Sequence, residues 1–216
     1  MMREKIPVAV LAATGTVGQR FVQLLADHPW FELTAVTGSD RTIDQPFGQA
    51  VNWIFPGEPP PAVASMIIKP TEPDLDAPLL FSALPSEMAQ ELEPRFAAAG
   101  YAVITNASAF RLAPDVPLVI PEVNPDHTAL IETQQAGRGW PGFIVASPNC
   151  STTSAILPLK VWQEAFGLEA AVITTLQAIS GAGYPGVASL DIHDNVVPFI
   201  SGEDAKLENE PRKLLG

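Results

Sequence analysis

The chain is poor in cysteine and in basic residues, and it lacks a long apolar run. The one cysteine in 216 residues, Cys150, cannot form a disulfide within the chain, which suits a reducing compartment, so we expect a cytoplasmic protein. Twelve basic residues against 24 acidic ones give a net charge of -12, which argues against a nucleic-acid or anionic membrane partner. No apolar run approaches the roughly 20 residues of a membrane helix, and "VAVLAA" is too short for a signal-peptide core.

The composition instead favours a globular protein with a sizeable core, because 47% of the residues are hydrophobic. The first forty residues predict a βαβ unit, with strands at residues 8–11 and 31–40. The helix between them, ended by Pro29, places four apolar residues on one face: Val17, Phe21, Leu24 and Leu25. The crossover between the strands implies a parallel sheet.

Strands and helices continue to alternate until about residue 148. Apolar runs predict further strands at residues 78–84, 101–108 and 116–124, with a weaker one at 64–69. A helix capped by Ser86 and stopped by Gly100 lies between the first two of these strands.

The pattern changes after Ser151. Residues 152–167 predict an apolar-faced helix that includes Pro158, and the β-rich residues 170–179 predict a strand. We therefore place a domain boundary near residues 147–150.

A glycine-containing turn joins the first predicted strand to the first helix. Gly15 and Gly18 occupy the position at which dinucleotide-binding domains hold a pyrophosphate, although Ala12 stands where the usual motif has its first glycine. Many such turns bind nothing, but the βαβ context favours a nucleotide. At the end of the second strand, Ser39 and Arg41 favour the 2′-phosphate of NADP, whereas Asp40 would suit NAD.

Cys150 lies in a setting that favours reactivity. A lone cysteine is most often a buried small hydrophobe, but this one follows Pro148 and Asn149 at a predicted helix start and near the predicted domain junction. The positive end of a helix dipole favours a thiolate, and clefts form at domain junctions. A thiolate beside a nicotinamide suggests aldehyde oxidation through a thioester.

Several segments together carry a family resemblance. The segments are "GTVGQRFVQLL", "FSALPS", "NASAFR", "PLVIPEVNP", "ASPNCSTT", "QAISGAGYPG" and "GEDAKLENEPRKLLG". From about Val8 to Gly216, the chain resembles aspartate-semialdehyde dehydrogenases of the archaeal and fungal type. The resemblance implies an α/β protein with a Rossmann-like NADP-binding domain at residues 1–148. The start of a mixed α/β catalytic and dimerisation domain would follow at residues 149–216.

The resemblance also implies a reaction, in which NADPH reduces L-aspartyl-4-phosphate to L-aspartate 4-semialdehyde and phosphate is released. This step feeds lysine, threonine, methionine and isoleucine synthesis, and the full-length enzyme would be a homodimer or homotetramer. Malonyl-CoA reductase, a close relative of this family with the same thioester chemistry, remains an alternative.

Site residues follow from the same resemblance. Cys150 is the expected nucleophile, and Gln177 would orient the substrate near it. Arg111 and Lys206 would bind phosphate and Glu203 the substrate ammonium, whereas residues 202–213 taken alone look like a solvated, charged helix start. Asn106 and Asn124 are expected polar lining residues. The cofactor would contact Thr14, Gly15, Thr16, Val17, Ser39, Arg41, Ser82, Ala83, Leu84, Pro85, Ser180, Gly181 and Gly183. No metal site is expected.

One part of the family's catalytic site is not found in this sequence. The family's acid–base histidine and the arginine that binds the substrate carboxylate lie beyond the motif that ends at Gly216, and His28, His127 and His193 do not match the histidine motif. We therefore expect an N-terminal portion that is inactive alone. A catalytically silent NADP-binding fragment is the alternative from a different class.

Overall fold

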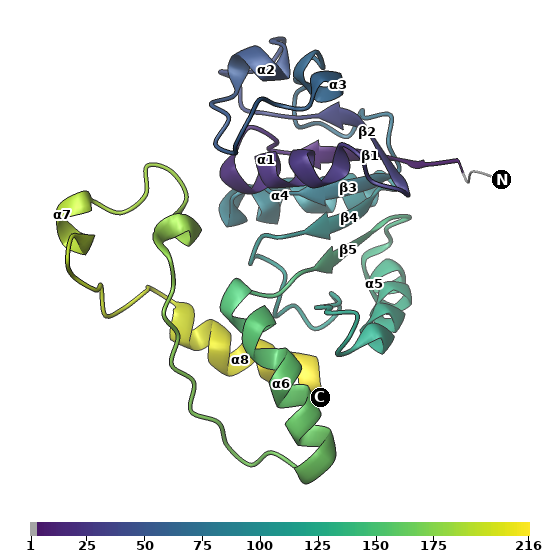
Figure 1. Cartoon of the computed structure of the whole chain (residues 1–216). Helices are drawn as coiled ribbons and strands as arrows, with labels where there is room; N and C mark the ends of the chain where they lie inside the picture. Colours follow the sequence, from purple (N-terminus) through teal and green to yellow (C-terminus); the bar gives the residue numbers. More distant parts are fainter. Residues whose placement is uncertain (1–3) are drawn as a thin grey trace.

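A five-stranded parallel sheet forms the centre of the protein in the computed structural model, which describes residues 4–216 (Figure 1). The strand order is β2-β1-β3-β4-β5. In chain order the strands are β1 (Ile6–Leu11), β2 (Phe31–Val36), β3 (Leu79–Ser82), β4 (Ala102–Thr105) and β5 (Phe143–Ala146). The predicted α/β class and parallel sheet are confirmed. After β1 the chain adds β2 on one side of it, and then adds β3, β4 and β5 on the other side. The order of the strands therefore reverses between β1 and β3, and open α/β sheets bind ligands at such a switch point.

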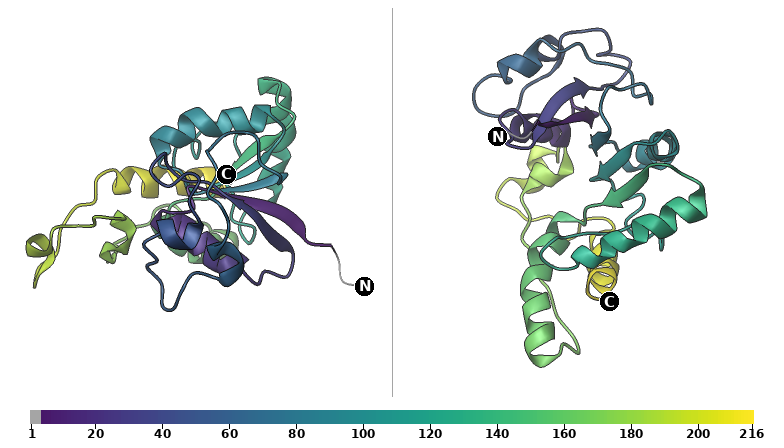
Figure 2. Two further views of the ribbon diagram at one scale, coloured as in Figure 1. Left: turned by 90° about the horizontal axis from the view of Figure 1, so that it is seen from above. Right: turned by 90° about the vertical axis from the view of Figure 1, so that its right-hand side faces the viewer.

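Helices cover both faces of this sheet (Figure 2). The longer ones are α1 (Thr16–Leu25), α4 (Ser86–Ala98), α5 (Leu130–Arg138), α6 (Cys150–Phe166) and α8 (Glu203–Leu215). The short helical segments are α2 (Phe47–Ala50), α3 (Pro61–Ala64), η1 (Pro125–Ala129), η2 (Ile179–Ala182) and α7 (Ser189–Ile192). Among residues 4–216, none of these helices is long and apolar enough to cross a membrane.

Two hydrophobic clusters hold the helices to the sheet. Val8 and Val10 of β1 join the cluster that includes Val22 of α1, whereas Ala9 and Leu11 join the cluster on the other face. This division follows from the two-residue period of a strand. The second cluster also takes residues from α4, α6 and α8, namely Ala89, Phe96, Ala97, Ile156 and Leu214, so α6 and α8 pack onto the body that contains the sheet.

The predicted strand at residues 116–124 is wrong, and β5 takes the edge position instead. Leu118 makes only an isolated bridge to Ala146. Pro117 and Pro121 lack the N–H groups that a continuous ladder needs, and β5 pairs with β4 without such interruptions. The weaker strand predicted at residues 64–69 is likewise reduced to isolated bridges at Ile67 and Lys69.

The predicted strand at residues 170–179 is also wrong. Its β-branched residues favour extended structure, but a strand requires a partner ladder, and none of the described residues pairs with this segment. Val172 and Leu176 are almost fully exposed. The segment lies in the long connection between α6 and α8, which runs away from the sheet (Figure 1).

Two helix predictions need smaller corrections. In α1 the inward face differs from the expected one, because Val17 and Leu24 are exposed while Gln19 is buried. In α4 the N-cap is Pro85, and Ser86 is the first helical residue. The Ser86 hydroxyl does not cap the helix, because it lies 2.7 Å from the Ser108 hydroxyl and accepts from the Ser108 amide.

Candidate functional site

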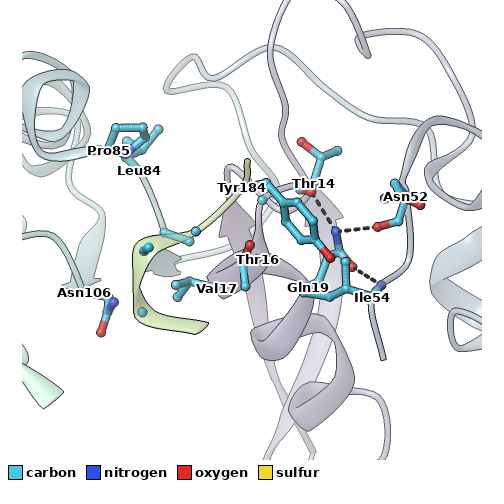
Figure 3. Close-up of a pocket in the computed structure, with 15 residues that line it drawn as sticks. Thr14, Thr16, Val17, Gln19, Asn52, Ile54, Leu84, Pro85, Asn106 and Tyr184 are labelled. Carbon is cyan, nitrogen blue, oxygen red and sulfur yellow. Dashed lines mark hydrogen bonds between the residues drawn. The ribbon is translucent and has the colours of Figure 1, made fainter. Parts of the chain in front are cut away.

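A pocket of about 660 Å³ lies at the carboxyl ends of the strands, at the switch point between β1 and β3 (Figure 3). Its volume falls within the range of about 300–1,000 Å³ that is usual for cofactor and ligand sites. Its lining comes from five parts of the chain: the turn into α1, the loop after α2, the loop after β3, the loop after β4, and the segment at η2. The lining residues are Thr14, Gly15, Thr16, Val17, Gln19, Asn52, Ile54, Ala83, Leu84, Pro85, Asn106, Gly181, Ala182, Gly183 and Tyr184.

The glycine turn brings α1 into close contact with β1. A Cβ atom at Gly18 would lie 2.2 Å from the carbonyl oxygen of Ala12 and 2.6 Å from Cα of Ala13, so only glycine fits there. Ala12, at the place of the motif's first glycine, adopts a left-handed conformation with φ 55, which costs a non-glycine residue on the order of 1 kcal/mol. Its amide donates to the hydroxyl of Thr37, which helps to hold the turn.

The start of α1 is suited to an anion. Gly15 caps the helix without a side-chain hydrogen bond, which leaves the amides of the first turn available, and the positive end of the helix dipole lies there. A pyrophosphate fits such a helix start, and the apolar wall at Leu84 and Pro85 suits a planar ring. The residues present therefore fit a dinucleotide.

Most of the predicted cofactor residues lie together in this pocket. Nine of them line it: Thr14, Gly15, Thr16, Val17, Ala83, Leu84, Pro85, Gly181 and Gly183. Ser82 is fully buried and does not line the pocket. Ser180 does not line it either, but it directly precedes the lining residue Gly181 in η2. Ser39 and Arg41 are exposed after the end of β2 and do not line the pocket.

Sequence reasoning missed Gln19, Asn52, Ile54 and Tyr184, which also line the pocket. Gln19 is 3% exposed and follows Gly18 directly. The available signal was its place directly after Gly18, because a glycine in the first turn of a helix marks close packing against the preceding strand. Asn52 and Ile54 belong to a proline-rich stretch with no period, so the sequence offered no signal for them.

Cys150 is the first residue of α6 and is exposed. The helix cap is Asn149, whose side chain accepts hydrogen bonds from the amides of Ser151 and Thr152 at 2.9 and 3.2 Å. Cys150 follows β5, so it lies at the same edge of the sheet as the pocket, although it does not line it. The predicted helix start at the cysteine is confirmed.

Glu203, at the start of α8, links the predicted catalytic residues. One carboxylate oxygen accepts from the Ser151 hydroxyl at 2.8 Å and from the Gln177 amide at 3.0 Å. The other lies 3.3 Å from Lys206 Nζ. Burial raises the pKa of Glu203, but the hydrogen bonds from Ser151, Gln177 and Lys206 outweigh it and hold the pKa below its ordinary value. The Glu203 carboxylate is therefore ionised, and it contacts Ser151, the residue that follows Cys150.

Arg111 is buried against α8. Its Nη1 lies 3.0 Å from a carboxylate oxygen of Glu210, and its Nη2 donates to the carbonyl of Asn106 at 2.8 Å. Its Nε is buried and has no hydrogen-bond partner among the described residues. The charged segment at residues 202–213 is thus not a solvated face, because Glu203 and Glu210 are both buried.

The remaining polar residues considered from the sequence have other surroundings. Asn124 is buried and bonds to the backbone of Leu118 and Ile120, which makes it a structural residue of a loop. His28 accepts from the backbone amides of Trp30 and Phe31. No group of three or more metal-ligating side chains occurs within residues 4–216.

Two family profiles match the chain. The one described as "Semialdehyde dehydrogenase, NAD binding domain" covers residues 7–131. The chain belongs to the semialdehyde dehydrogenase family. The profile described as "Semialdehyde dehydrogenase, dimerisation domain" covers residues 159–216. The resemblance inferred from the sequence is therefore confirmed.

Individual members of the semialdehyde dehydrogenase family are closely similar to this chain. It is 54% identical to the aspartate-semialdehyde dehydrogenase of Archaeoglobus fulgidus over 97% of the chain. It is 43% identical to a malonyl CoA reductase (NADP) of Metallosphaera sedula over 99% of the chain. These alignments span 61% and 60% of the relatives' own lengths.

A solved member of the semialdehyde dehydrogenase family shares the fold of the whole chain. This is the aspartate semialdehyde dehydrogenase of Candida albicans, whose structure was solved with NADP. It superposes with a TM-score of 0.86 at 40% identity and covers 99% of this chain and 61% of its own.

Proposed function

We propose that the protein containing this chain is an aspartate-semialdehyde dehydrogenase, which reduces L-aspartyl-4-phosphate with NADPH and releases phosphate and L-aspartate 4-semialdehyde. The observation that carries the proposal is the pairing of a dinucleotide-sized pocket at the switch point with an exposed cysteine at a helix start on the same sheet edge. Family membership supports it, as do relatives of that name at 54% and 51% identity.

NADP is the proposed cofactor. Its pyrophosphate would lie at the first turn of α1, near Gly15 and Thr16, and its nicotinamide would approach Ala83, Leu84 and Gly181. Ser39 and Arg41 follow β2 and are exposed, so they are available to a 2′-phosphate at the far end of the cofactor. The Candida albicans relative, solved with NADP, supports this assignment.

The chemistry runs through the Cys150 thiolate. Its sulfur attacks the acyl carbon of the substrate, and the bond from that carbon to the phosphate oxygen breaks, which leaves a thioester and free phosphate. NADPH, when bound, supplies the hydride that reduces the acyl group. Cleavage of the carbon–sulfur bond then releases the aldehyde and restores the thiolate.

Gln177 and Glu203 are the proposed orienting groups. Gln177 donates a hydrogen bond to Glu203, and Glu203 accepts another from Ser151, the residue after Cys150. These contacts would fix the position of the Gln177 amide, which orients the substrate, relative to the nucleophile. Glu203 would bind the substrate ammonium, and Lys206 and Arg111 the phosphate. Each terminal nitrogen of Arg111 uses one N–H, toward Glu210 and toward the carbonyl of Asn106, and keeps a second N–H that an anion could accept.

The wider organisation follows from the same proposal. Residues 1–148 would form the NADP-binding domain and residues 149–216 part of the catalytic and dimerisation domain. The active protein would be a homodimer or homotetramer in the cytoplasm, where a single cysteine stays reduced.

Malonyl-CoA reductase is the second candidate, and the relative in Metallosphaera sedula is the observation that favours it. The test uses the longest polypeptide that contains this sequence. NADPH formation is followed with L-aspartate semialdehyde and phosphate, then with malonate semialdehyde and CoA. Turnover that depends on phosphate and disappears in Cys150→Ala supports the proposal. Turnover with CoA alone assigns the second candidate, and NADP binding without turnover with either pair indicates a silent binding fragment.

A further inference from the structure

Gln19 uses its whole amide group to join two walls of the pocket. Its Nε2 donates to the carbonyl of Thr14 at 2.9 Å and to the carbonyl of Asn52 at 3.1 Å. Its Oε1 accepts from the amide of Ile54 at 3.0 Å. Figure 3 shows the side chain between these groups, with the glycine turn on one side and the loop on the other.

The loop at residues 51–56 depends on this anchoring. It contains no regular structure, and Gln19 holds the backbone on both sides of Trp53. Gln19 reaches the loop because Gly18 lets α1 lie directly against Ala12 and Ala13. A glutamine amide offers two donors and an acceptor, and all three are used.

We propose that Gln19 is a positioning residue for the cofactor. It holds the loop at residues 52–54 against the turn that receives the pyrophosphate, so the two walls form one preformed surface. The inference rests on the proposed function, since it concerns the affinity for NADP. It goes further by assigning part of that affinity to a side chain in α1 that acts through the loop.

The amide pattern also fixes which side chains can replace Gln19. Leucine keeps most of the volume but leaves two carbonyls and one amide without partners in a buried place. Glutamate keeps the shape but turns both donors into acceptors, which would face the carbonyls of Thr14 and Asn52. If Gln19 acted only by packing, the leucine variant, which keeps most of the volume, would behave like the wild type.

The first experiment measures the dissociation constant of NADPH by its own fluorescence, at 20 °C, well below the unfolding transition of each variant. Gln19→Leu and Gln19→Glu are compared with Gln23→Leu and Gln23→Glu. Gln23 lies one turn later in α1, is partly exposed and accepts a hydrogen bond from Arg20. We expect the Gln19 variants to bind NADPH at least about tenfold more weakly and the Gln23 variants to change by less than about twofold.

A second measurement needs no cofactor. Hydrogen exchange at the Ile54 amide should be at least about tenfold faster in both Gln19 variants and unchanged in the Gln23 variants. Wild-type affinity in the Gln19 variants, or equal losses in the Gln23 variants, would overturn the inference. If the wild type binds no NADPH, the proposed function fails, and the Ile54 exchange still decides whether Gln19 holds the loop.

Discussion

The backbone amide of Asn149 donates a 2.6 Å hydrogen bond to a carboxylate oxygen of Glu210, which lies 61 residues further along the chain. The other oxygen of that carboxylate pairs with Arg111. Asn149 is the cap of α6, so a buried acid in α8 holds the residue before Cys150 and the proposed phosphate-binding arginine at one place. Lys213, one turn later in α8, adds three hydrogen bonds to the carbonyls of Arg111, Ala113 and Val116.

Glu210→Ala should lower the free energy of unfolding by about 3–5 kcal/mol, because it leaves the Arg111 charge and the Asn149 amide buried without their acceptor. Urea denaturation measures this loss. The matched control is Glu208→Ala, an exposed acid in the same helix, which should change stability by less than about 0.5 kcal/mol. Equal effects at the two positions would show that the Glu210 contacts do not stabilise the protein.

Glu93 should make stability depend on pH. Burial raises its pKa to about 7, and the hydroxyls of Thr105 and Ser82 offset only part of this effect. The folded state therefore binds this proton more tightly than the unfolded state. The stabilisation is complete below about pH 4.5, falls as pH rises, and is lost above about pH 7, a difference on the order of 3 kcal/mol.

Urea unfolding at pH 5.5 and pH 8 tests this dependence. Glu93→Gln keeps an acceptor for Thr105 and removes the buried charge, so it should be more stable than the wild type at pH 8 and flatten the pH profile. Glu91→Gln, at an exposed position in the same helix, should leave the profile unchanged. A pH profile that survives in Glu93→Gln would contradict the assignment.

Gly15 and Gly18 should respond differently to alanine. A methyl group at Gly18 would overlap backbone atoms of Ala12 and Ala13, so Gly18→Ala should cost about 1–3 kcal/mol of stability. At Gly15 the nearest atom would be 3.5 Å away and φ is -76, so Gly15→Ala should keep its stability. It should nonetheless weaken NADPH binding, because Gly15 lines the pocket. Thermal unfolding and NADPH titration separate the two effects, and similar unfolding midpoints for both variants would refute the packing argument.

The strands and the glycine turn could be predicted because their signals are local. The apolar run of β1, the strand pattern of β2 and the spacing of Gly15 and Gly18 mark a βαβ unit whose strand ends meet at one edge. Cys150 could be placed at a helix start for the same reason, since Asn149 is a favourable cap. The position of Cys150 at the same edge of the sheet depends on β5, which the sequence analysis did not predict.

The contacts that organise the site could not be predicted in the same way. Apart from Lys206, the partners of Glu203 and Glu210 lie 26 to 99 residues away. An acidic helix is therefore predicted to be solvated until its partners are known. The strand predicted at residues 170–179 failed because extended structure depends on a partner strand. The inward face of α1 was misjudged because Gln19 satisfies its polar groups inside the protein, which a count of apolar residues does not detect.

The most direct test of the central claim is to trap the acyl-enzyme. The longest polypeptide containing this chain is mixed with NADP and L-aspartate semialdehyde in the absence of phosphate, and both NADPH and the intact protein mass are followed. The account predicts a burst of about one NADPH per active site and an aspartyl group on Cys150, released on addition of phosphate. A burst that persists in Cys150→Ala, or an acyl group found on another residue, would contradict it.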